Sequence, residues 1–289
     1  MRERGFLATV LLACVLFAPS TALAGPWTPE PGHGFAKLWT KWLLGHGYVD
    51  GNGNRTNYGN YHEFFVATYG DIGIVDGLAA FWHTDLLRVF TLQDPRTGER
   101  QAHVAPGDPA LGLRWRFLQV DRFVMSVEGS VRAPLARSRP VQNVYARSDP
   151  HEQLGELRVG AGVWNVDGRL SLGYGFDRVY LAASGGYQWR GEGFDDRITW
   201  SAEVGGNFTD RWGGRARASG AHSLDEDGAP RGNSPSGIGN GVSWAGFALE
   251  VDYRLRDGWY LGLTLEGGLS GLRRQTGGPV TSLWVATQY

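Results

Sequence analysis

The chain of 289 residues contains very little sulfur: one cysteine, Cys14, and two methionines. A single thiol excludes an internal disulfide framework. The seven histidines are scattered along the chain, and their spacing does not match a metal-binding motif. We therefore expect no metal site and no cofactor.

The chain also lacks an excess of charge of either sign, because its formal net charge is −1. Only two lysines occur, Lys37 and Lys41, and the remaining basic residues are arginines. Nucleic-acid-binding domains usually carry a clear basic excess. We therefore expect no nucleic-acid partner.

Long hydrophobic runs are missing after the N-terminus, although 42% of the residues are hydrophobic. No apolar stretch there reaches the roughly 18 residues of a transmembrane helix. Glycine is abundant, with 44 residues, and glycine destabilises helix interiors. The 12% of aromatic residues argue against a disordered chain. These features exclude helical membrane proteins and favour β-structure.

The first 24 residues have the layout of a secretory signal peptide. A short charged start precedes an apolar stretch from Phe6 to Phe17, and Ala22-Leu23-Ala24 forms a cleavage site before Gly25. We expect this segment, with Cys14, to be removed on export. A lipoprotein signal ending at Cys14 is the alternative, but its apolar stretch would be very short.

From about residue 108 onward, apolar residues occupy every second position, as between Trp164 and Phe176. This period of two indicates β-strands with one apolar face. The alternating segments run about 10–14 residues, longer than the roughly 5–6 of a soluble strand. They suit tilted membrane strands, which need about 9–11 residues. Strand length therefore argues against a soluble β-sandwich.

Short turns alternate with mostly long loops, which is typical of outer-membrane barrels. The pattern predicts an all-β fold: a 12-stranded antiparallel transmembrane β-barrel with short periplasmic turns and longer extracellular loops. Residues 154–162 also alternate, and would be a thirteenth strand or an upward extension of the sixth. The expected strands are residues 34–46, 59–70, 73–85, 106–118, 122–134, 164–176, 178–190, 196–208, 211–223, 241–255, 258–270 and 279–289.

The expected organisation is a signal peptide at residues 1–24, a periplasmic N-terminal segment at 25–33 and a barrel at 34–289. The last strand alternates and ends on the aromatic residue Tyr289. This ending resembles the signal read by the outer-membrane barrel insertion machinery, which we expect as a partner. Outer-membrane lipid and lipopolysaccharide are the other expected contacts in a Gram-negative bacterium.

The chain resembles small outer-membrane porins and transporters, most of all the transporter barrels grouped under the phenol-degradation MetA-pathway label. The pieces that carry this resemblance span most of the chain after residue 24, and each is degenerate. The resemblance implies transport of small aromatic or hydrophobic compounds. The pieces are Trp27-Thr28, Gly32 to Leu38, Tyr69-Gly70, Gly107 to Arg114 and Gly186 to Arg190.

The polar strand faces are expected to line the lumen, where basic residues outnumber acidic ones. Arginine presents a planar fork that suits carboxylate, sulfate or phosphate, and positive rings favour anions in pores. Ion-pair ladders that only stiffen the barrel are the alternative reading. The candidate pore-lining residues are Lys37, Lys41, Arg114, Arg116, Glu128, Arg132, Arg169, Arg190, Arg197, Glu203, Arg215, Arg217, Glu250, Asp252 and Glu266.

These observations predict a non-enzymatic outer-membrane channel for passive uptake of small solutes, anionic or aromatic. A structural or closed barrel without channel activity is the first alternative. A membrane-embedded lipid hydrolase is the second alternative. His222 and Ser243 are expected near the same rim of the barrel, at strand positions whose side chains face outward. No third residue of a catalytic triad is evident for it.

Overall fold

The computed structural model describes residues 25–94, 97–138, 142–145, 153–225 and 236–289. This part of the chain is all-β, with a single 3₁₀ turn at Leu135–Ser138. In the same ranges, no helix is long and apolar enough to cross a membrane. The predicted signal peptide lies outside the described residues.

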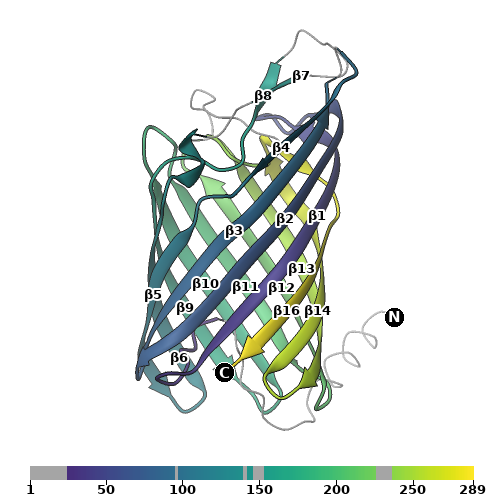
Figure 1. Cartoon of the computed structure of the whole chain (residues 1–289). Helices are drawn as coiled ribbons and strands as arrows, with labels where there is room; N and C mark the ends of the chain where they lie inside the picture. Colours follow the sequence, from purple (N-terminus) through teal and green to yellow (C-terminus); the bar gives the residue numbers. More distant parts are fainter. Residues whose placement is uncertain (1–24, 95–96, 139–141, 146–152, 226–235) are drawn as a thin grey trace, which may run out of the picture.

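Twelve strands form a closed antiparallel barrel, as the sequence predicts (Figure 1). We call its two openings the short-turn end and the long-loop end. The strands are β1 (Gly34–Val49), β2 (Arg55–Val75), β3 (Leu78–Gln93), β5 (Ala110–Val120), β6 (Phe123–Arg132), β9 (Asn165–Gly175), β10 (Val179–Arg190), β11 (Arg197–Asn207), β12 (Trp212–Ser223), β13 (Ser243–Arg256), β14 (Trp259–Arg273) and β16 (Val280–Gln288).

Strand β1 closes the barrel because it pairs with β2 on one side and with β16 on the other. Trp39, for example, faces Ala67 of β2 and Trp284 of β16. The last residue continues this closure. The Tyr289 carbonyl accepts a bond from the Gly34 amide at 2.9 Å, and its own amide donates to the Gly34 carbonyl at 3.1 Å.

Two expected connections are wrong. The turn predicted at residues 70–73 lies inside β2, and the chain reverses at Asp76-Gly77, where Gly77 adopts a φ of 76°. The predicted long link at 86–105 is mostly strand, because β3 continues to Gln93 and pairs with β4 (Arg100–Ala105). These strands rise beyond the membrane-spanning length, so their upper parts need not alternate between lipid and lumen.

A bulge at Leu86 interrupts the alternation of inward and outward side chains in β3. Leu87 pairs with Val66, but Asp85 pairs with the next residue, Ala67, so Leu86 is left over. Such an extra residue exchanges the two faces of a strand. Phe81 and His83 therefore face inward below the bulge, and Arg88 and Phe90 do so above it.

Residues 154–162 are neither a thirteenth barrel strand nor an extension of β9. Strand β8 (Gln153–Leu157) pairs with β7 (Gln142–Tyr145) in a separate two-stranded sheet. This hairpin stands above the long-loop end (Figure 1). A third short strand, β15 (Gln275–Gly277), pairs with the upper part of β1.

The outward face is apolar, as a lipid-facing barrel requires. Large apolar side chains are exposed on it along the strands, including Leu111 and Leu113 of β5 and Leu261, Leu263 and Leu265 of β14. Aromatic side chains mark its two rims. The exposed ones are Phe117, Phe176, Phe208, Trp212 and Trp259 near the short turns, with Trp164, Trp189 and Trp200 near the opposite rim.

Several strand glycines make room for large aromatic rings on the neighbouring strand. A Cβ at Gly262 would lie 2.1 Å from the Trp284 ring, and one at Gly112 would lie 2.3 Å from the Phe81 ring. A Cβ at Gly205 would similarly meet the ring of Tyr180 at 2.5 Å. These inward glycines therefore hold aromatic residues flat against the barrel wall.

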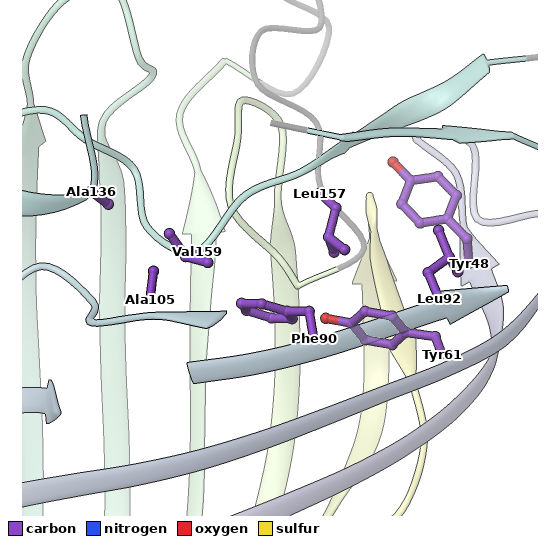
Figure 2. Close-up of a cluster of buried hydrophobic side chains, with 8 residues drawn as sticks. All are labelled: Tyr48, Tyr61, Phe90, Leu92, Ala105, Ala136, Leu157 and Val159. Carbon is purple, nitrogen blue, oxygen red and sulfur yellow. The ribbon is translucent and has the colours of Figure 1, made fainter. Parts of the chain in front are cut away.

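The loop between β6 and β9 folds inward at the long-loop end. Its Ala136, Leu157 and Val159 pack on a buried cluster from the upper parts of the first strands (Figure 2). The strand residues of this cluster are Tyr48, Tyr61, Phe90, Leu92 and Ala105.

A single carboxylate fastens both ends of this loop. Asp108, which is buried, accepts the Ala136 amide at 2.7 Å through one oxygen. Its other oxygen accepts the Gly162 amide at 3.0 Å. Asp108 therefore holds together the two ends of a loop that is 32 residues long, from 133 to 164.

We expect Asp108→Ala to release the loop without opening the barrel. Each lost bond from a charged acceptor is worth about 1.5–3 kcal/mol. Trypsin should then cut the loop, which contains Arg137 and Arg147, faster than in the parent protein. Asp257→Ala, in the exposed turn after β13, is the matched control. Equal cleavage rates in the three proteins would show that Asp108 does not hold the loop.

Candidate functional site

The barrel encloses a cavity of about 910 Å³, which we call the chamber. All twelve barrel strands contribute residues to its lining. The described residues contain no cluster of histidine, cysteine, aspartate and glutamate that could hold a metal ion. The residues that line the chamber can be compared with the pore-lining residues predicted from the sequence.

The chamber has two unlike sides. The aromatic wall comes from the neighbouring strands β16, β1, β2 and β3, and the polar wall comes from β6 and β9 to β12. The aromatic wall consists of Phe35, Trp39, Phe65, Tyr69, Phe81, His83 and Trp284. The polar wall consists of Glu128, Ser130, Arg132, Asp167, Arg169, Ser171, Ser184, Gln188, Thr199, Ser201, Glu203, Arg217 and Ser219.

Arg114 of β5 joins several parts of the lower chamber. Its guanidinium pairs with Asp71 at 3.1 Å and with Glu128 at 2.7 Å. It also donates to the Tyr69 hydroxyl at 3.0 Å and to the Trp27 carbonyl at 3.1 Å. Arg114 is buried, and its partners come from β2, β6 and the segment before β1. Its role is therefore structural cross-bracing: it links these parts of the barrel.

Glu250 is the centre of a second network. Its carboxylate pairs with Lys37 at 2.9 Å and with Arg215 at 2.5 Å. It also accepts the Thr264 hydroxyl at 2.9 Å. The ammonium of Lys37 lies 4.0 Å from the centre of the Trp284 ring as well. Both cations are therefore held within the wall, where the single Glu250 carboxylate balances one of their two charges.

Two further ion pairs lie higher in the chamber. Lys41 pairs with Glu266 at 2.8 Å, and Arg88 pairs with Glu63 at 2.8 Å. The Arg88 guanidinium also lies 4.2 Å from the centre of the Phe65 ring and donates to the Val159 carbonyl of the inward loop.

Arg169 and Arg217 differ from the other basic residues of the chamber. In the described part of the chain, neither side chain carries a hydrogen bond or an ion pair. Their cross-strand neighbours are Glu128 and Glu203. Glu128 is bound by Arg114, and Glu203 accepts the Tyr180 hydroxyl at 2.6 Å. Both arginines are exposed and face the chamber.

Residues 25–31 cross the short-turn end inside the barrel, and we call them the N-terminal strap. Pro31 forms a bridge with Gly73 of β2. On the opposite side, Trp27 lies edge-on to Tyr180 of β10, with ring centres 5.5 Å apart. A Cβ at Gly173 of β9 would collide with Pro26 and Trp27. The strap therefore narrows this opening.

Loops narrow the other opening. Arg190 and Arg197 both donate to the Gly239 carbonyl, at 2.9 and 2.6 Å. Asp195 accepts the Gly241 amide at 2.9 Å. Through these bonds the loop before β13 is held over the barrel, and its Ser236 and Gly237 line the chamber.

The structure brings most of the predicted pore residues together. Four lie outside the lining: Arg116 pairs with the exposed Asp76 at a short turn, Arg190 and Arg197 hold the loop, and Asp252 lies nearer the short turns. The others line the chamber: Lys37, Lys41, Arg114, Glu128, Arg132, Arg169, Glu203, Arg215, Arg217, Glu250 and Glu266.

The sequence analysis missed the charged residues of β2 and β3. Glu63, Asp71 and Arg88 all lie on the inner surface and pair there. The bulge at Leu86 hides Arg88, since it changes the parity of β3. Glu63 and Asp71 share the odd parity of Phe65 and Tyr69, and only a correct turn position would have revealed it.

Ser243, the second residue of the lipid-hydrolase alternative, does not present an exposed hydroxyl at the rim. Its side chain is buried, and its hydroxyl accepts the Ser223 amide at 3.0 Å. The pairing of β13 with β14 is irregular between Ser243 and Ala245. His222 is exposed, as predicted.

Arg114 and Arg116 make a matched pair for a stability test. We expect Arg114→Met to lower the free energy of unfolding by about 3–5 kcal/mol, because it leaves the buried Asp71 and the half-buried Glu128 without their cation. Arg116→Met removes an exposed pair worth about 0–1 kcal/mol. Urea unfolding in lipid vesicles measures both values. Similar losses for the two variants would contradict the role of Arg114 as cross-bracing.

No family model matches the chain, and no curated protein matches it either. Among solved structures it is similar to the COG4313 outer membrane channel from Pseudomonas putida F1, with a TM-score of 0.59 and 11% identity. That match covers 93% of this chain and 100% of the channel. A weaker match is a KdgM porin, with a TM-score of 0.49 and 6% identity, covering 88% and 99%. The comparison with the COG4313 channel confirms that the fold is that of a small outer-membrane barrel.

Proposed function

We propose that the protein is an outer-membrane channel for passive passage of small solutes. The observation that carries this proposal is the polar, charged chamber inside a barrel whose outer surface is apolar. Small barrels that serve only as scaffold can fill their interior with side chains, whereas this barrel keeps a polar volume of about 910 Å³, enough for a small solute. The similar channel from Pseudomonas putida F1 supports the same function.

The location follows from the same features. We propose export by the signal peptide at residues 1–24 and insertion into a bacterial outer membrane with the short turns in the periplasm. Cleavage after Ala24 would leave Gly25, which lines the chamber, as the first residue. The C-terminal strand ending at Tyr289 would serve the insertion machinery. Lipid and lipopolysaccharide would surround the apolar surface.

The proposed solute path runs along the eleven chamber residues of the predicted set, past the N-terminal strap. The competing proposal is a closed or structural barrel without channel activity. The narrowing of both openings of the barrel favours this alternative. A lipid hydrolase is less well supported, because the Ser243 hydroxyl is buried and engaged by a backbone amide.

We expect the refolded protein to conduct ions in a planar lipid bilayer. Trp27→Ala should raise the single-channel conductance, because the indole fills space between Gly173 and Tyr180 at the narrowed end. Trp212→Ala, which removes an exposed indole from the lipid-facing rim, should leave the conductance unchanged. Absence of current in the parent protein and in Trp27→Ala would favour the closed barrel.

A further inference from the structure

The chamber combines two recognition surfaces that are usually found apart. The aromatic wall offers ring faces, with Trp39 stacked on His83 at 5.7 Å and an interplanar angle of 2°. Across the lumen, the polar wall offers hydroxyls and the guanidinium groups of Arg169 and Arg217. The strand order places the walls on opposite sides, since β1 and β2 lie about half the ring away from β9 to β12.

The chamber lining carries a positive excess, because eight lysines and arginines line it against six carboxylates. Arg114, Arg215, Lys37, Lys41 and Arg88 each pair with a carboxylate of the wall. Arg132, Arg169 and Arg217 have no such partner in the described part of the chain, and of these only Arg132 has a hydrogen bond, to the Asp108 carbonyl at 3.0 Å. A guanidinium that is held in a narrow lumen without a carboxylate is a binding group for an incoming anion.

We propose that the chamber selects small aromatic carboxylates, a class that benzoate represents. The ring would lie against Trp39 and Phe65, and the carboxylate would face Arg169 and Arg217. The inference rests on the proposed channel function and narrows its substrate class. Neither an aliphatic acid nor a neutral arene can use both walls, so each should bind more weakly than the aromatic acid.

The test measures how strongly added solutes block the potassium chloride current of the channel in a planar bilayer. Benzoate should reach half-block at a concentration about tenfold lower than acetate, and also about tenfold lower than benzyl alcohol, as a single good charged or stacked contact implies. Isothermal titration calorimetry of the detergent-solubilised protein measures binding of the same three compounds without any current.

Three variants separate the contributions of the two walls. Arg169→Gln and Arg217→Gln should each weaken benzoate binding by about tenfold and leave benzyl alcohol unchanged. Trp39→Leu should weaken benzoate more than acetate. Arg122→Gln is the control for overall charge, because Arg122 lies on a short turn and pairs with the exposed Asp177 at 2.7 Å.

The outcomes distinguish the two proposals. Current with equal block by benzoate and acetate, or with unchanged binding in Arg169→Gln and Arg217→Gln, would overturn the aromatic-acid site and leave the channel standing. Calorimetric binding of benzoate without current would support the site and overturn the channel. If benzoate neither binds in calorimetry nor blocks the current, the aromatic-acid site is overturned.

Discussion

The closed hydrogen-bonded ladder is the constraint on which the structure depends. A bilayer offers no water to satisfy backbone amides and carbonyls, so every strand must be paired on both edges. β1 meets this requirement by pairing with β2 and β16, and Gly34 and Tyr289 extend the closure to the chain end. Once the ladder is closed, side chains can only point to lipid or to the lumen. Because neighbouring strands project their inward side chains on the same side of the lumen, each wall of the chamber comes from a set of contiguous strands.

Glycine and aromatic residues act together on this ladder. Gly112 and Gly262 leave room for Phe81 and Trp284 to lie against the barrel wall instead of across the lumen. Larger residues at these positions would push the rings inward and fill the chamber. Glycine is unfavourable within a strand because it lacks a packing side chain, and here the neighbouring ring supplies the missing contact. The high glycine content therefore helps to keep the cavity open.

The strand pattern was enough to predict the barrel, its strand number and the two faces from β5 to β16. It failed where the periodicity itself is interrupted. One bulge at Leu86 moves Arg88 to the inner surface, and the chain turns at Asp76-Gly77, beyond the turn expected between residues 70 and 73. The strap and the inward loop were also not predictable. Their positions depend on tertiary contacts, such as Trp27 with Tyr180 and Asp108 with Ala136, which have no periodic signature.

The same limits explain why the expected basic excess of the lumen is smaller in the structure. Counting arginines on strand faces omits Glu63 and Asp71, which lie on β2, where a turn was wrongly expected at residues 70–73. It also includes Arg190 and Arg197, which hold a loop. With these residues assigned, most lumen cations have a carboxylate partner, and such pairs stiffen the wall without attracting a solute. Selectivity then depends on the imbalance that remains. Among the described chamber residues, three arginines lack a carboxylate partner. Arg132 donates to the Asp108 carbonyl instead, whereas Arg169 and Arg217 lie beside Glu128 and Glu203, which Arg114 and Tyr180 already engage. The buried networks thus determine which arginines remain available to an anion.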